Sequence, residues 1–326
     1  MNAEIMQPPQ LSTGRLLLLG LSSVVLCVSF IVSVFAPFPL ALAVILYGRT
    51  KGILTGLVGL ILTFVFSTFV YSDLTLFGFY ACVFIFGIAI AELITRGFHP
   101  IKGLVIFGLG FILTISGSIY LVIKSQNMTA HQFVTQQLEK SSDKLEVQKK
   151  LIEESGNRES IEVLQLLDKP ELMAKEIVSA FPSYFFMGTF LMLWFNMFLA
   201  LKSRRLLLAA NDYPYSEKNL LNFKVPFGFV PVLVAGLVLV VWGENLGVAN
   251  SESIGLTIIK CLGIFYFFQG FGVFTDLLSF LGVAGFFRTL IVMIVIFMAN
   301  YLIAAAGLFD NWFDFRKYFV KTKTED

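Results

Sequence analysis

The hydrophobic pattern constrains this chain more than any other feature. Apolar runs follow one another from Leu16 to Leu308, and a single long polar segment, residues 124–177, interrupts them. Hydrophobic residues make up 57% of the sequence and charged residues 14%, which leaves more apolar surface than a soluble domain can bury. We therefore predict an all-α, polytopic transmembrane helical bundle whose main partner is the lipid bilayer.

The lengths of the runs predict about eight or nine spans, because a helix needs roughly 20 residues to cross about 30 Å of hydrocarbon. The runs near that length are Leu16–Val34, Ile53–Val70, Leu74–Thr95, Gly103–Ile123, Val178–Leu201, Phe227–Trp242, Ile254–Thr275 and Phe287–Leu308. Phe38–Tyr47, which follows Pro37, is too short to cross as a regular helix. Whether it crosses fully stays open, although the charges beyond it require the chain to have returned.

The orientation follows from the lysines and arginines of the short connections. If Phe38–Tyr47 crosses, one side of the membrane collects Arg15, Arg49, Lys51, Arg96, Lys102, Lys202, Arg204, Arg205, Lys218 and Lys224. The other side collects Asp73, Glu244 and Glu252. We therefore predict a multi-pass membrane protein with a cytoplasmic N-terminus. If every run crosses, the basic tail lies outside against this rule, so its side stays open.

The polar segment divides the chain. We expect an N-terminal transmembrane half (1–123), an amphipathic helical extracytoplasmic insert (124–177), a C-terminal transmembrane half (178–308) and an amphipathic interfacial tail (309–326). Within the insert, apolar residues recur near helical spacing among Glu, Lys and Gln, which favours helices over disorder. The insert is either a lid over a site or a solvated hairpin that only tethers the two halves.

Small residues form stripes on two of the predicted helices. Gly48, Gly52 and Gly56 are four residues apart and share one helix face, where another backbone can approach closely. Gly110 and Gly117 belong to a second stripe. Packing within this bundle accounts for both stripes, and docking to a partner subunit is the alternative.

Polar side chains within the apolar runs are candidates for function, because an unpaired polar group in lipid is costly. The set comprises Asn196, Lys260, Gln269, Asp276 and Asn300. We predict a solute cavity lined by Asn196, Tyr266, Gln269 and Asn300. For Asp276, a structural pair with Arg288 is the simpler interpretation.

The tail carries an amphipathic pattern. Leu308, Trp312, Phe315 and Phe319 fall on one helix face, and Asp310, Asp314, Lys317 and Lys321 fall on another. This pattern predicts an interfacial helix that is anchored by its aromatics and has an Asp314–Lys317 pair on its wet side. If the tail is instead buried in protein, Asp310, Asp314 and Arg316 would form a paired polar lock that closes the bundle.

The sequence contains no constellation typical of an enzyme. His99 and His131 stand alone, Cys27, Cys82 and Cys261 are scattered, and no GxxxxGK[ST] run occurs. We therefore predict no catalytic residues, no metal and no cofactor, and we expect no nucleic-acid partner from a net charge of +2.

Several motifs resemble those of a known family. They are Phe181-Pro182-Ser183, Asn196 followed by Leu201-Lys202-Ser203-Arg204, Phe223-Lys224-Val225-Pro226, Phe268-Gln269-Gly270, and the run from Gly307 to Lys317. Together they resemble the YybS-like family of bacterial membrane proteins of unknown function, which implies a location in the bacterial inner membrane. That family is itself distantly similar to the S components of energy-coupling-factor transporters. The run from Tyr47-Gly48-Arg49 to Gly56-Leu57 resembles the glycine-marked helices of the S components of energy-coupling-factor vitamin transporters. That second resemblance implies a substrate-binding helical core.

Two functions are consistent with these observations. The first is a component that binds or transports a small solute; it lacks its own ATPase and so depends on a partner ATPase module or an ion gradient. The second is a non-transporting membrane scaffold or assembly factor, which would use the insert and the tail to contact a membrane protein partner.

Overall fold

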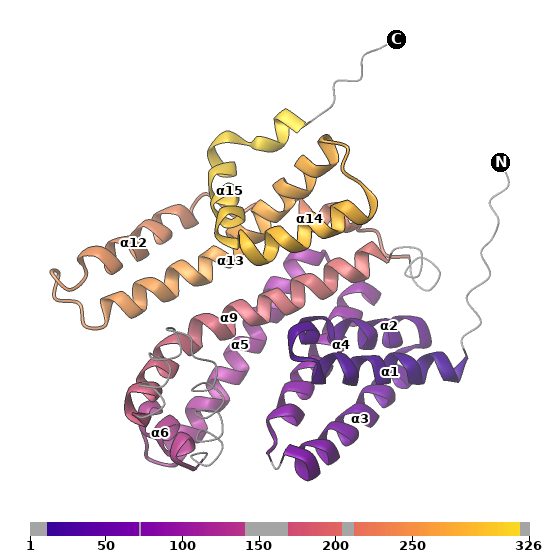
Figure 1. Ribbon diagram of the computed structural model, residues 1–326, viewed down its shortest axis with the longest axis horizontal. Coiled ribbons are helices and arrows are strands. Elements are labelled where there is room, and N and C mark those ends of the chain that lie inside the picture. The colour runs from indigo at the N-terminus through magenta and orange to yellow at the C-terminus, as the bar shows by residue number, and fades with distance from the viewer. Residues whose placement is uncertain (1–11, 72, 141–168, 204–211, 320–326) are drawn as a thin grey trace, which may run out of the picture. The chain divides into compact units, whose positions relative to one another are not determined.

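The computed structural model describes residues 12–71, 73–140, 169–203 and 212–319, and the regular elements in these ranges are all helical (Figure 1). The all-helical class predicted from the sequence is therefore confirmed. The central part of the predicted insert, residues 141–168, and the end of the tail lie outside the described residues.

Within the described residues, five helical stretches are long and apolar enough to cross a membrane. They are Arg49–Val70, which contains α3 (Arg49–Phe66) and most of the π-helical turn η2 (Ser67–Tyr71), α4 (Thr75–Thr95), α5 (Pro100–Ser125), α9 (Pro170–Lys202) and α13 (Ser251–Phe280). A bent pair, α14 (Gly285–Met298) and α15 (Asn300–Phe313), raises the number to six if it counts as one span. Shorter apolar helices lie at Thr13–Val28, Val32–Tyr47 and Phe229–Trp242.

One predicted span is broken. The apolar run Phe287–Leu308 was expected to form one helix, but α14 ends at Met298 and the chain bends by 94° before α15. Ala299 at the break has a ψ of 29°, outside the helical range, so the hydrogen-bond ladder does not continue. The apolar composition of this run therefore did not reveal that it forms two helices rather than one straight span.

The chain forms two compact units. The first contains residues 1–109, 188–227 and 263–326, and the second contains 110–187 and 228–262. In the first unit, α1 (Thr13–Val28), the 3₁₀ turn η1 (Phe30–Phe35), α2 (Pro37–Tyr47), α3 and α4 pack together (Figure 1). Their buried core comprises Cys27, Ala36, Leu40, Tyr80 and Val83.

Aromatic packing joins α9 to α13 in the first unit. The rings of Trp194 and Phe268 stack with centroids 4.9 Å apart, and Phe271 meets Trp194 edge-on at 5.1 Å. Further along α13, a Cβ on Gly270 would collide with the backbone of α15 at Ile303, and one on Gly307 would collide with α13. The two glycines therefore allow α13 and α15 to approach more closely than larger residues would permit.

The second unit contains the rest of α5 and α13, α6 (Ala130–Lys140), the first part of α9, and α12 (Phe229–Trp242). Phe181 and Phe185 of α9 stack at 5.4 Å. The ammonium of Lys260 lies 4.7 Å from the centre of the Tyr184 ring, which compensates part of the cost of a cation in an apolar helix.

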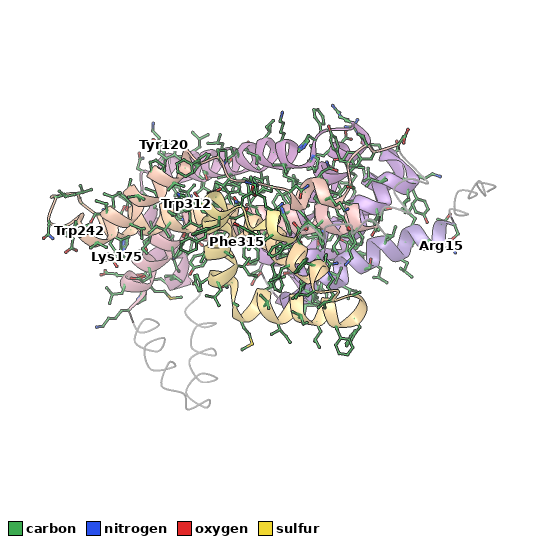
Figure 2. The ribbon with its side chains drawn as sticks, turned by 90° about the horizontal axis from the view of Figure 1, so that it is seen from above. Arg15, Tyr120, Lys175, Trp242, Trp312 and Phe315 are labelled. Atoms are coloured by element: carbon green, nitrogen blue, oxygen red, sulfur yellow. The ribbon has the colours of Figure 1, made fainter. Side chains whose placement is uncertain are left out.

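Many large apolar side chains face outward, as expected for helices solvated by lipid. Figure 2 shows the side chains of Tyr120 and Trp242 on the outside of the ribbon. On α5, Ile106 and Leu113 are 74% and 72% exposed. Surfaces of this kind confirm lipid contact as the main environment of the chain.

Candidate functional site

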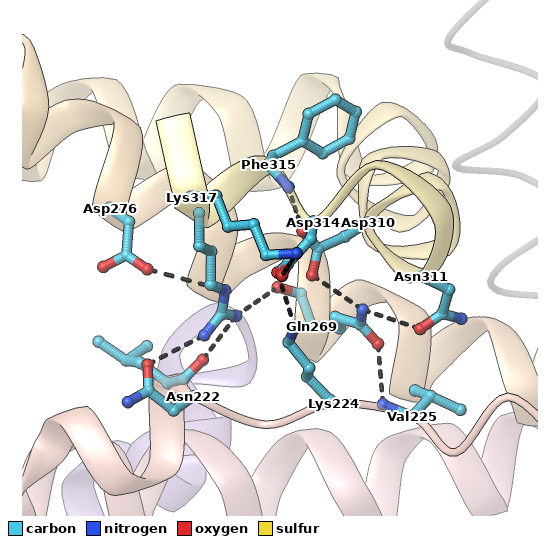
Figure 3. A network of polar contacts seen from close by, with 12 residues as sticks. Asn222, Lys224, Val225, Gln269, Asp276, Asp310, Asn311, Asp314, Phe315 and Lys317 are labelled. Atoms are coloured by element: carbon cyan, nitrogen blue, oxygen red, sulfur yellow. Dashed lines mark hydrogen bonds and ion pairs between the residues drawn. The ribbon is translucent and has the colours of Figure 1, made fainter. Parts of the chain in front are cut away.

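Gln269 is the centre of a polar cluster in the first unit (Figure 3). Its Oε1 accepts a hydrogen bond from the backbone N–H of Val225 at 2.8 Å. Its Nε2 donates to Asp310 Oδ2 at 3.0 Å and to Asn311 Oδ1 at 3.2 Å. Because the side chain is fully buried, these contacts supply the partners that water cannot.

Asp310 lies in the last turn of α15 and is only 1% exposed. Its Oδ2 faces Gln269, and its Oδ1 accepts from the backbone N–H of Phe315 at 2.9 Å. The tail prediction placed Asp310 on the wet face of a continuous helix, and this was wrong. The helix ends at Phe313 because Asp314 adopts a left-handed conformation with φ of 46°, so the helical spacing does not extend to the 3₁₀ turn η3 (Phe315–Phe319).

Arg316 extends from η3 across the cluster. Its Nη1 donates to Asn222 Oδ1 at 3.0 Å, and its Nη2 donates to the carbonyls of Leu221 and Gln269 at 2.9 and 3.3 Å. Its Nε lies 3.7 Å from Asp276 Oδ2. The guanidinium thus connects three segments that are far apart in the sequence.

The pairing expected for Asp276 differs in the structure. Its ion pair is with Arg316, whereas Arg288 donates to the carbonyl of Thr275 at 3.2 Å. The prediction chose Arg288 because it is near in sequence. The fold brings Arg316 to Asp276 through the turn at Asp314, which sequence spacing does not reveal.

Two lysines surround Asp314 at the edge of the cluster. Lys224 Nζ lies 2.7 Å from Asp314 Oδ1, and Lys317 Nζ lies 2.9 Å from Oδ2. The hydrogen bonds from Lys224 and then Lys317 lower the pKa of Asp314 to about 2, and the carboxylate raises the pKa of Lys317. The structure contains the predicted Asp314–Lys317 pair, with Lys224 as an unexpected third member.

These residues form the C-terminal polar cluster, which comprises Asn222, Lys224, Gln269, Asp276, Asp310, Asn311, Asp314, Arg316 and Lys317. Of the polar lock considered for a buried tail, Asp310 is buried, but Arg316 pairs with Asp276 and η3 contains no buried residue. Trp312 is half exposed and contacts Phe227 edge-on at 5.8 Å, and Phe315 is half-buried. The anchoring role predicted for the two aromatics stays a prediction.

The four residues of the predicted solute cavity have different surroundings in the structure. Asn196 is buried and its Nδ2 donates to the carbonyls of Val34 and Met192, both at 2.6 Å. Tyr266 is buried with a hydroxyl that has no partner among the described residues. Gln269 belongs to the polar cluster, and Asn300 is exposed at the start of α15. That these four residues line one cavity stays a prediction.

A pocket of about 380 Å³ lies instead beside α4. Its lining residues are Arg49, Ile85, Ile88, Ala89, Glu92, Leu93, Arg96, Phe98 and Phe107. Arg49 Nε and Arg96 Nε each lie 2.8 Å from Glu92, on its Oε1 and Oε2 respectively. The charge rule used both arginines to orient the chain. Arg96 follows Glu92 by four residues, a spacing that favours a helical ion pair, whereas no local pattern links Arg49 to Glu92.

The glycine stripes differ from one another. A Cβ on Gly52 would lie 2.5 Å from Val44 Cα, and one on Gly56 would collide with the Phe84 ring, so both mark close helix contacts. Gly48 precedes α3 with φ of 87°, where its conformation rather than packing requires glycine. Gly110 and Gly117 have open space around the Cβ position, contrary to the packing predicted for them.

Among the described residues, no group of three or more His, Cys, Asp or Glu side chains could hold a metal ion. The polar cluster is built instead from amides, carboxylates, one guanidinium and two ammonium groups. Such groups can bind a proton or a small polar solute by hydrogen bonds.

Comparison with known proteins identifies a family. The family described as "Predicted membrane protein (DUF2232)" matches residues 16–311. The chain therefore belongs to this family of predicted membrane proteins. Neither the curated proteins nor the solved structures contain a match to it.

Proposed function

We propose that this member of the DUF2232 family is a small-solute transport component of the bacterial inner membrane, driven by a proton gradient through Asp310. The observation that carries the proposal is a buried carboxylate on α15, hydrogen-bonded to Gln269 of α13. An ionisable group inside an apolar helix bundle is costly and commonly marks an ion or substrate pathway in membrane proteins.

The surroundings of Asp310 suit a group that exchanges a proton. Its hydrogen-bond donors are neutral, the amide of Gln269 and the backbone N–H of Phe315. Among the described residues, no cation lies within ion-pair distance of its carboxylate. A proton on Oδ2 would compete with the N–H of Gln269 for that oxygen, so protonation would loosen the contact between α15 and α13.

The break between α14 and α15 adds support. Interrupted helices at membrane depth are tolerated where they line a site, and many secondary transporters bind their substrates at such breaks. The resemblance to YybS-like proteins, and through them to S components, points toward solute transport as well. A partner ATPase module is the alternative source of energy, since the sequence has no nucleotide-binding motif of its own.

The polar cluster also supports a cytoplasmic tail. Lys224, assigned to the cytoplasm by the charge rule, contacts Asp314, and Arg316 contacts Asn222. The segment that contains Asn222 and Lys224 and the tail lie on the same side of the membrane if α12 and α13 each cross it and the α14–α15 pair enters and leaves on one side. This arrangement gives about eight crossings and removes the conflict posed by the basic tail.

Cysteine labelling tests this topology. In a variant without Cys27, Cys82 and Cys261, a cysteine at exposed Tyr318 should react with an impermeant maleimide only after spheroplasts are lysed. A cysteine at Ser141, in the insert, should react in intact spheroplasts. Labelling of both positions in intact spheroplasts would place the tail outside and contradict the proposal.

Reconstitution tests the transport proposal. The full chain is placed in proteoliposomes containing a pH-sensitive dye, and small-molecule fractions of a bacterial extract are added. We expect at least one fraction to cause proton entry with the wild-type protein but not with Asp310→Asn. Asp212→Asn, which removes an exposed carboxylate outside the polar cluster and the helix break, should leave proton entry intact.

The scaffold alternative makes a different prediction. If no fraction moves protons and purification in mild detergent recovers stoichiometric protein partners, the transport proposal is wrong and a scaffold is favoured. Recovery of an ATPase partner together with solute uptake that is insensitive to Asp310→Asn would replace the proton gradient by ATP.

A further inference from the structure

The pocket beside α4 combines charge at one end with apolar walls. Glu92 is held between two guanidinium groups, each through its Nε atom. Arg49 and Arg96 keep more than half of their side-chain surface exposed, at 64% and 59%, whereas Glu92 is 21% exposed. One carboxylate thus orients two arginines and leaves a net positive charge at the mouth.

The terminal nitrogens of both arginines are available to a ligand. Only the Nε atoms of Arg49 and Arg96 have a partner among the described residues. Each guanidinium has further N–H groups arranged in a planar fork, which matches the oxygens of a phosphate or carboxylate. The charge and the geometry therefore favour an anion.

The remaining walls indicate that this anion carries an apolar part. Ile85, Ile88 and Phe107 line the pocket, and Ile85 and Phe98 are 41% and 53% exposed. The backbone of Phe98 is held in place because its carbonyl accepts a hydrogen bond from the Tyr213 hydroxyl at 2.7 Å. A soluble anion would leave these apolar side chains unused.

The position of the pocket favours a lipid over a free solute. Glu92 and Arg96 lie at the end of α4, a helix that is long and apolar enough to span the membrane, and Arg49 begins α3. Side chains at such helix ends lie at the level of lipid headgroups. A pocket of about 380 Å³ accommodates a headgroup and the start of an acyl chain, and the chain can continue along exposed apolar surface.

We propose that this pocket binds an acidic phospholipid, with its phosphate between Arg49 and Arg96 and an acyl chain against Ile85, Ile88 and Phe107. The site is separate from the Asp310 cluster, so the inference does not depend on proton-driven transport. Bound lipid would hold the ends of α3 and α4 together at the membrane surface.

Native mass spectrometry of the purified full chain tests the proposal. Phosphatidylglycerol and phosphatidylcholine with identical acyl chains are titrated separately. The wild-type protein should bind phosphatidylglycerol about tenfold more tightly, the factor expected for charge-assisted hydrogen bonds. This comparison needs no variant, so it remains decisive if a substitution impairs folding.

Matched variants locate the preference. Arg49→Gln combined with Arg96→Gln should abolish the preference while leaving phosphatidylcholine binding unchanged. Lys51→Gln combined with Lys102→Gln removes two exposed cations outside the pocket lining, one on α3 and one at the start of α5, and should retain the preference. Millimolar inorganic phosphate should not displace the lipid.

Three results would overturn the inference. The first is equal affinity of the wild-type protein for the two lipids. The second is equal loss of the preference in the arginine and lysine variants, which would indicate general surface charge. The third is displacement by inorganic phosphate, which would assign the pocket to a free anion.

Discussion

Two regions of the molecule, the helices α1–α4 and the C-terminal polar cluster, are each stabilised by a different kind of contact. In the first region, small residues let helices meet closely, as where Gly52 faces Val44 and Gly56 faces Phe84. In the second, Gln269, Asp310 and Arg316 join their segments by hydrogen bonds and an ion pair. Lipid provides no hydrophobic drive for helices to associate, so a membrane protein depends on these two devices.

The two kinds of contact differ in whether they can respond to a change of protonation. Close packing of small residues stabilises one arrangement and offers no group that changes charge. A buried polar network can change with protonation, because each of its contacts depends on which atom carries a proton. The C-terminal region is therefore the part of the chain suited to switching, and α1–α4 is suited to holding a fixed shape.

We expect the largest effect from a substitution that disrupts the polar cluster. Gln269→Leu removes the donor to Asp310 and the acceptor of the Val225 N–H, leaving buried groups without partners. We expect a loss of roughly 3 kcal/mol in the free energy of unfolding. Thermal unfolding in detergent measures it, with Asn300→Leu as the control amide, exposed on α15 and expected to change stability little. Equal effects of the two changes would contradict the importance of the cluster.

A somewhat smaller effect should follow from overpacking α1–α4. Gly52→Leu places side-chain atoms where the Val44 backbone lies, so α2 and α3 must separate. The expected cost is about 1–3 kcal/mol. Gly110→Leu, with open space at its Cβ position, is the matched control and should cost much less. The same thermal assay applies. Leucine has a higher helix propensity than glycine at both positions, so equal destabilisation by both changes would contradict the close packing at Gly52.

The smallest effect concerns the lysines around Asp314. The lowered pKa of Asp314 means that its contacts stabilise the folded state fully above the unfolded pKa, near 4, and are lost as the pH falls through about 2. The difference in melting temperature between the wild-type protein and Lys224→Gln should therefore shrink between pH 4 and pH 2. A difference that stays constant over this range would mean that Lys224 acts without Asp314.

Local sequence patterns predicted the elements but not their long-range partners. The run Leu74–Thr95 matches α4 closely, because composition and length determine a span. The tail failed at Asp314, whose left-handed conformation ends a helical pattern that continues in the sequence. Aspartate tolerates this conformation better than most residues, yet nothing in the spacing required it.

The candidate site was found only in part. Gln269 and Asp310 were both singled out, but in separate roles, because they are 41 residues apart and no local pattern links them. Gly270 and Gly307 form no stripe, so their close approach could not be read from spacing. Glu92 was not predicted as a site residue, because the two arginines that pair with it were interpreted only as orientation signals.

The most direct test of the proposed proton site is infrared difference spectroscopy of the reconstituted protein with and without an imposed proton gradient. A carboxyl group that gains a proton in a buried environment produces a new C=O stretching band. We predict such a band in the wild-type protein, its absence in Asp310→Asn, and its persistence in Asp314→Asn. No band in the wild-type protein, or an undiminished band in Asp310→Asn, would show that Asp310 does not exchange a proton and would contradict the proposed mechanism.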